Sequence, residues 1–73
     1  MNLYGLVEEF QKKVNEVVAL MDEAKAHAGQ IPDVPLGDAA NKIKLIFGIC
    51  DDSKKNLQEA IGLAEDIEKL LRG

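Results

Sequence analysis

Few residues in this sequence have side chains of the kinds that carry out chemistry. Cys50 is the only cysteine and His27 the only histidine, so one chain offers neither a disulfide nor the usual zinc site. A reactive cysteine needs a cationic neighbour that favours the thiolate, and Lys54, one turn later, is a weak candidate. On a helical hairpin Cys50 and His27 would lie roughly 16 Å apart along the axis, too far for a catalytic pair. We expect Cys50 to be a small buried side chain and His27 to lie half-exposed at a helix end.

The remaining polar residues form no motif for catalysis or for a cofactor. Asp51 and Asp52 are adjacent, but the spacing of a calcium-binding loop is absent. Ser53 is the only serine, and there is no glycine-rich loop of the kind that holds a phosphate. We therefore expect no catalytic residue, no cofactor and no bound metal. The candidates for binding a small anion between subunits are Lys42, Lys44 and Lys54.

The charge and hydropathy of the chain bear on its partners. The net charge is −4 and the pI about 4.8, whereas proteins that bind nucleic acid normally present positive charge. No apolar run approaches the ~18 residues that cross a bilayer, and the N-terminal sequence lacks the basic start of a secretory signal. The sequence predicts no nucleic-acid partner and no membrane partner, and a cytoplasmic location is the expectation.

The elements that position these residues are predicted to be helices. From Leu3 onwards, apolar residues recur at alternating steps of four and three, the spacing of a helix that packs along one seam. The seam positions are Leu3, Val7, Phe10, Val14, Val17, Met21, Ala24 and Ala28. Gly29 is of the type that ends helices in the left-handed conformation, and two prolines follow it closely. The pattern predicts a helix over about 2–28 and a loop over 29–35.

A second apolar seam with the same spacing follows the loop. Its positions are Leu36, Ala39, Ile43, Ile46, Cys50, Ser53, Leu57, Ala60, Ala64, Ile67 and Leu71. Read locally, Gly48 followed by Asp51, Asp52 and Ser53 is typical of one helix ending and another starting. The seam passes through this stretch in phase, which favours one helix over about 36–72, continuous or broken near 50–53. The predicted fold is an all-α antiparallel hairpin in a single domain over 1–73, with a compact three-helix bundle as the alternative.

The apolar surface of the second helix exceeds what the first helix can cover. At about 1.5 Å per residue, the second helix is longer by roughly 14 Å and should project past the start of the first. The residues expected to mediate self-association are Ile61, Ala64, Ile67, Leu70 and Leu71. Dimerisation into a four-helix bundle would cover such a surface. Leu45, Gly48 and Gly62 lie opposite the seam, and we expect them to contact another protein.

The loop sequence "IPDVP", at 31–35, is followed by 38 residues and resembles the outline of type III secretion needle subunits. The hairpin as a whole resembles the small helical partners of type VII secretion. The chain departs from both, because it lacks the N-terminal aromatic residue of the needle subunits and the Trp-x-Gly turn of the type VII proteins. The resemblance is one of shape, and it implies a secretion-system or filament subunit.

These features together indicate a function in protein binding. The sequence predicts a non-enzymatic protein–protein interaction module, acting as a small regulator, inhibitor, adaptor or chaperone through helix packing. Its expected partners are itself, as a homodimer or a higher oligomer, and another protein. Two alternatives stay open: an oligomer that sequesters a small anion or nucleotide, and a secretion-system or filament subunit.

Overall fold

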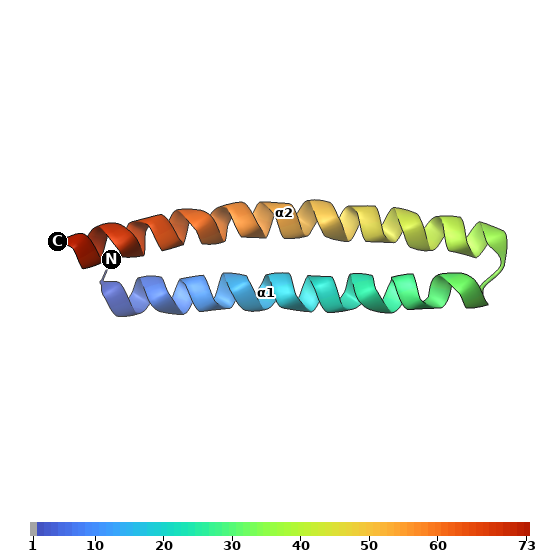
Figure 1. Ribbon diagram of the computed structural model, residues 1–73, viewed down its shortest axis with the longest axis horizontal. Helices are drawn as coiled ribbons and strands as arrows, with labels where there is room; N and C mark the ends of the chain where they lie inside the picture. The colour runs from blue at the N-terminus through green and yellow to red at the C-terminus, as the bar shows by residue number, and fades with distance from the viewer. Residues whose placement is uncertain (1) are drawn as a thin grey trace.

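The computed structural model describes residues 2–73 and consists of two long antiparallel helices (Figure 1). Helix α1 spans Leu3–Gln30, the short 3₁₀ helix η1 spans Ile31–Asp33, and helix α2 spans Leu36–Arg72. The part of the chain that the structure describes contains no strand. The predicted all-α hairpin is confirmed, and the compact three-helix alternative is wrong because α2 is unbroken.

Helix α1 begins with a side-chain cap. The Oδ1 atom of Asn2 accepts a hydrogen bond from the backbone N–H of Gly5 at 2.7 Å. This bond satisfies one of the amide groups that the first turn of any helix leaves without a partner. The polar residue that precedes the apolar pattern therefore fixes where the helix starts.

The end of α1 differs from the prediction at Gly29. The helix continues for one more residue, and its C-cap, Ile31, keeps right-handed helical dihedral angles that lead directly into η1. Within residues 2–73, a positive φ occurs only at Gly73. The predicted left-handed ending at Gly29 is wrong because the 3₁₀ turn takes its place, and only Val34 and Pro35 remain as loop.

Helix α2 runs without interruption through the stretch that suggested a break. Asp51 and Asp52 are exposed, whereas Ser53 faces α1 and is 3% exposed. Residues that favour helix caps do not end a helix when the apolar pattern on both sides keeps one phase, since tertiary packing overrides local propensity. The continuity of the seam was therefore the better guide than the local composition.

The two helices are offset less than the sequence predicts. Lys13 contacts Glu59, and His27 contacts Lys42, which together place the start of α1 alongside about residue 68. Because η1 adds a helical turn before the chain reverses, each residue of α2 lies nearer the loop end of α1 than predicted. Its C-terminal overhang is accordingly about one turn, shorter than expected.

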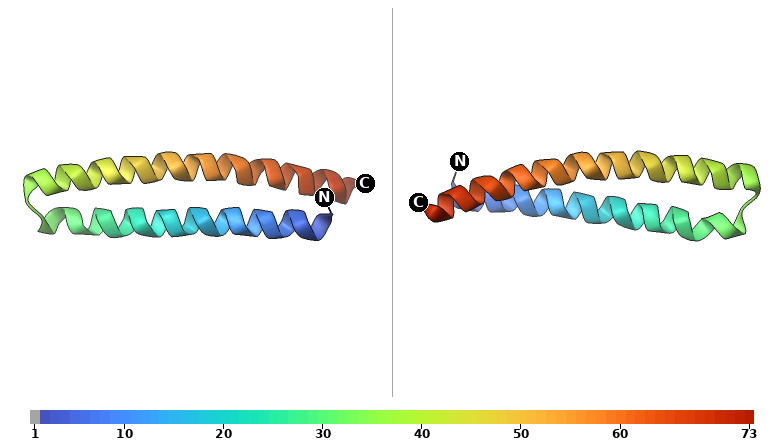
Figure 2. Two further views of the ribbon diagram at one scale, coloured as in Figure 1. Left: turned by 180° about the vertical axis from the view of Figure 1, so that it is seen from behind. Right: turned by 45° about the horizontal axis from the view of Figure 1, so that its top comes forward.

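The hairpin is long and thin. Its Cα atoms extend over 56 × 15 × 14 Å, and the radius of gyration is 16.6 Å, against about 11 Å for a compact chain of this length. The views in Figure 2 show α1 and α2 side by side along their length, with η1 at one end. A molecule of this shape has one layer of contacts, so each helix keeps sides that have no partner in the same chain.

Candidate interaction surface

The seam between α1 and α2 is a narrow core. The side chains that are at least partly buried at its repeating positions are Leu6, Phe10, Lys13, Val17, Leu20, Ala24 and His27 on α1, and Ala39, Lys42, Ile46, Ile49, Ser53, Asn56, Ala60, Leu63 and Ile67 on α2. Among residues 2–73, the buried apolar ones are Leu6, Ile49 and Ala60. Ser53 is buried with them, and its Oγ has no hydrogen-bond partner. The other large apolar side chains of the seam keep part of their surface exposed.

Charged side chains occupy several seam positions and pair across it. The Lys13 Nζ atom lies 2.6 Å from Glu59 Oε2, and the Lys42 Nζ atom lies 3.3 Å from His27 Nδ1. The hydrogen bond with Glu59 raises the pKa of Lys13, and the same bond lowers the pKa of Glu59. His27 is half-exposed at the loop end, as predicted, with Nε2 3.9 Å from Glu23 Oε1. These contacts fix the register of the helices without adding an apolar core.

The seam matches the prediction at every second position and is displaced by one residue at the positions between. The confirmed positions are Phe10, Val17 and Ala24 on α1 and Ala39, Ile46, Ser53, Ala60 and Ile67 on α2. Val14 and Met21 were expected to face α2, but the residues directly before them, Lys13 and Leu20, take these places. The same shift of one residue occurs along α2, where Ile49 is buried and Cys50 is exposed. The expectation of a buried Cys50 is therefore wrong. The predicted seam was the centre of an apolar arc, and the partner helix covers one edge of that arc only.

The uncovered edges of the two arcs lie on the same long side of the hairpin. Most exposed apolar residues directly follow a seam position, as Val14 follows Lys13 and Leu57 follows Asn56. One residue advances the side chain by about 100° around a right-handed helix. Because the helices run in opposite directions and face each other at the seam, this step turns both sets of side chains toward the same side. The two stripes thus lie on one side of the hairpin. Four polar residues occupy the same repeating positions and interrupt the stripes: Gln11, Lys25, Lys54 and Glu68.

This apolar face is large and well defined. Of the thirteen large apolar side chains found exposed, ten belong to it, including Phe47 at 65% and Ile61 at 56%. Its members are Tyr4, Val7, Val14, Val18 and Met21 on α1, and Leu36, Ile43, Phe47, Cys50, Leu57, Ile61 and Leu71 on α2. Single exposed apolar residues are ordinary on protein surfaces, but a contiguous face is typical of an interaction site.

The opposite side of the hairpin is acidic. A carboxylate stands directly before a seam position in most heptads, where the same geometry turns it away from the apolar face. These residues are Glu9, Glu16 and Glu23 on α1 and Asp52, Glu59 and Asp66 on α2. In one heptad of α2, Leu45 takes this place. The hairpin is therefore amphipathic across its width, and the acidic side is the one suited to water.

The residues predicted for self-association fall into two groups. Ile61 and Leu71 belong to the apolar face, and Leu70 is also exposed, at 47%. Ala64 and Ile67 are partly buried beside the first turns of α1, because the overhang of α2 is short. The set predicted for self-association did not include Phe47 and Leu57, which lie at the centre of the face. The signal that could have found them was the pair of apolar stripes, one residue apart, along each helix.

The residues predicted to bind another protein lie on the acidic side. Leu45 is 51% exposed there, and Gly48 and Gly62 have no atom within 4 Å of the place where a Cβ would stand. No close approach within the chain therefore requires either glycine. Leu45 is isolated among polar residues, so this side carries a much smaller apolar surface than the other.

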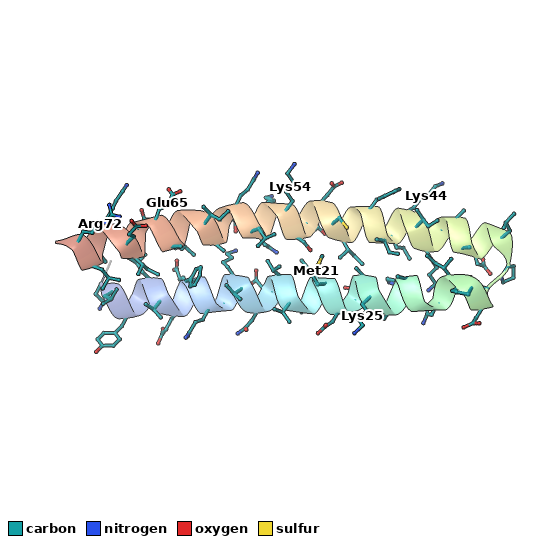
Figure 3. The ribbon with its side chains drawn as sticks, in the orientation of Figure 1. Met21, Lys25, Lys44, Lys54, Glu65 and Arg72 are labelled. Carbon is teal, nitrogen blue, oxygen red and sulfur yellow. The ribbon has the colours of Figure 1, made fainter. Side chains whose placement is uncertain are left out.

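The three lysines considered for an anion site are not brought together within one chain. Lys42 is partly buried at the seam beside His27. Lys44 and Lys54 project from the edge of α2 that points away from α1 (Figure 3), about 15 Å apart along the helix. Such a site would need residues from a second subunit.

Neither a cluster of metal ligands nor a membrane-spanning helix occurs within residues 2–73. No cluster of three or more His, Cys, Asp or Glu side chains there is arranged to hold a metal ion. In the same part of the chain, neither long helix has a stretch apolar enough to span a bilayer. The apolar face remains as the surface with a defined shape and chemistry.

Comparisons with known proteins give no family for the chain. No family model matches it, and no curated protein or solved structure is significantly similar to it. A function for this hairpin is therefore inferred from its own residues and geometry.

Proposed function

We propose that this chain is a non-enzymatic protein–protein interaction module, a small regulator, inhibitor, adaptor or chaperone that binds through helix packing. The observation that carries this proposal is the apolar face. Monomeric soluble proteins rarely expose contiguous apolar patches of more than a few hundred Å², and larger patches mark binding sites. A helical face with apolar residues at steps of three and four is a surface suited to pack against further helices.

The physical reason that favours binding is that few side chains are buried in the seam. Domains of this size usually need a disulfide, a metal or association to be stable. The single cysteine excludes a disulfide within the chain. Covering the apolar face with protein would supply the missing burial, so binding and stability are coupled in this proposal.

Native mass spectrometry of the chain purified from its source cells tests the proposal. The expected spectrum shows a complex of fixed stoichiometry whose mass exceeds 8.0 kDa by the mass of one or more polypeptides. A species at 8.0 kDa alone, or one carrying only a small molecule, would contradict a protein-binding function. The Leu57→Glu variant, altered on the apolar face, should lose the complex, whereas Leu45→Glu on the acidic side serves as a control for added charge.

A further inference from the structure

We propose that the apolar face is occupied by a second copy of this chain, packed face to face with the loops at opposite ends to form a four-helix bundle. This inference rests on the proposed function, since it names the partner for the same surface. It also names the orientation of that partner.

The exposed area of the chain has the right size for this partner. The chain exposes 5470 Å², whereas a compact monomer of 8.0 kDa exposes about 4,450 Å². The excess is about 1,000 Å², and stable interfaces bury about 800 Å² on each partner. One further hairpin laid along the face would cover the excess.

The direction of the face matches the architecture of a bundle. In a four-helix bundle each helix has two neighbours, which lie at about a right angle around its axis. The apolar face begins where the seam ends and lies about a quarter turn farther round each helix. Each helix of the hairpin thus has one seam for its own neighbour and one for a helix of the second copy.

The α2 stripe of the apolar face is also self-complementary, as a twofold interface requires. Its positions are spaced nearly symmetrically about a point between residues 53 and 54. A twofold axis that passes α2 there brings Cys50 opposite Leu57 of the other copy, and Ile43 opposite Ala64, which directly follows the seam residue Leu63. In both pairs a larger side chain meets a smaller one, which favours close packing.

The α1 stripe has its own centre at the same level of the hairpin. Residue 16 of α1 lies alongside about residue 55 of α2, by the contacts that set the register. The same twofold axis therefore brings Val14 opposite Val18 of the other copy. The ammonium of Lys54 can stay in water, because its side chain projects from the outer edge of α2 (Figure 3).

Charges along the outer edge of the face decide between the two possible orientations. With the loops at opposite ends, Lys44 comes near Glu65 of the other copy, and Lys25 comes near Glu8. With the loops at the same end, Glu8 would come near Glu65 and Asp22 near Asp51, so that like charges meet. Opposite charges at such flanking positions set partner orientation in helical bundles. The charges therefore favour opposite ends.

A cysteine pair tests the orientation directly. In the proposed dimer, Leu57→Cys places a thiol across the interface from Cys50 of the other copy. Within one chain the two sulfurs cannot join, because seven residues of helix separate their Cα atoms by about 10.5 Å, beyond the reach of about 7 Å. Under mild oxidation we expect at least tenfold more covalent dimer for Leu57→Cys than for wild type. Leu45→Cys, with its second thiol on the acidic side, should stay at the wild-type level.

Sedimentation equilibrium tests the association itself. Wild type should sediment as a species of twice 8.0 kDa. Leu57→Glu should weaken dimerisation at least tenfold, and Leu45→Glu should not, with helicity followed by circular dichroism. Wild-type monomer at all concentrations, equal weakening by both variants, or efficient crosslinking of Leu45→Cys alone would overturn the inference. If native mass spectrometry then showed a different protein bound, the proposed function would stand without the dimer; an 8.0 kDa chain with no bound protein would end both.

Discussion

The seam and the apolar face of this hairpin differ less in composition than the inside and the outside of a protein usually do. The seam lies inside the hairpin, yet it includes Lys13, Lys42, Ser53 and Asn56. The face lies outside, yet it consists largely of valine, isoleucine, leucine and phenylalanine. In a protein that is stable alone, the more apolar of two surfaces is the one that folding hides. The comparison therefore supports the proposal that the seam is part of a larger core.

This view explains why so few side chains are buried in one chain. A helix in a four-helix bundle buries an apolar arc against two neighbours, and in the hairpin it has one. Leu6 and Ile49 are buried because they occupy seam positions, whereas Phe47 lies on the apolar face and is 65% exposed. In the proposed dimer, part of the free energy that holds the fold together would come from surface that a single chain leaves in water.

The largest expected effect is the loss of stability on truncating the face. Phe47→Ala should lower the free energy of unfolding by about 3 kcal/mol, at least as much as Ile49→Ala, because the proposed dimer would bury the ring. Urea unfolding followed by circular dichroism at a fixed chain concentration measures both. The matched control is Leu45→Ala, which should change stability by no more than about 0.5 kcal/mol. A Phe47→Ala effect as small as that of the control would show that the face is solvated.

The sequence was sufficient for the architecture of the hairpin. The bounds of α2 follow from the apolar pattern that starts at Leu36 and ends near Leu71, and the prolines mark the reversal of the chain. The end of α1 was harder, because a glycine can be accommodated in a right-handed helical turn as well as in a left-handed cap. Gly29 took the first course, and nothing in its immediate neighbours distinguishes the two.

The phase of the seam could not be read from the sequence with the same certainty. Each helix carries two apolar stripes one residue apart, and both fit a heptad pattern. The choice between Lys13 and Val14 as the seam residue depends on pairing across to α2, where Glu59 meets the lysine. Such a contact between residues distant in sequence is invisible to periodicity alone. The sequence therefore predicted an apolar interaction surface, but it did not predict the residues at the centre of that surface.

A smaller change in the free energy of unfolding would test whether the polar residues of the seam weaken it as a core. Ser53→Ala should raise the free energy of unfolding by about 1 kcal/mol, because it removes a buried hydroxyl without a hydrogen-bond partner. The matched reverse change is Ala60→Ser, at a position that is 4% exposed, and it should cost a similar amount. Thermal unfolding of the two variants against wild type measures both. Destabilisation by Ser53→Ala would mean that the hydroxyl has a bonding role at the seam.

The two glycines on the acidic side offer a contrast with both apolar surfaces. Gly48→Ala and Gly62→Ala should each stabilise the chain by about 0.5–1 kcal/mol, since alanine favours helix and its Cβ meets only open space. Gly73→Ala is the control and should not stabilise the chain, because a φ of +84° there disfavours any side chain. If a target approaches α2 at these glycines, the alanine variants should bind it less well while being more stable. Failure to gain stability would indicate that something already contacts these positions.

The smallest effect concerns the ion pair that joins the seam to the acidic side. Because the pKa of Glu59 is lowered in the folded chain, the pair stabilises it above the ordinary carboxyl pKa of about 4.3, and this is lost as pH falls through the lowered value. Because the pKa of Lys13 is raised, the contribution is also lost as pH rises through that raised value in alkali. Glu59→Gln should therefore lower Tm near pH 7 and make no difference at pH 2. Salt should weaken the effect at pH 7 by screening the ion pair.

The control for this ion pair is Glu9→Gln, which removes the same charge from an exposed side chain on the acidic side. It should leave the pH dependence of Tm close to that of wild type, because the carboxylates that Lys13 contacts are Glu16 and Glu59. Equal pH profiles for the Glu59 and Glu9 variants would mean that Lys13 and Glu59 act only through net charge. A difference confined to Glu59→Gln would instead show that a polar contact helps to hold the two helices together at the seam.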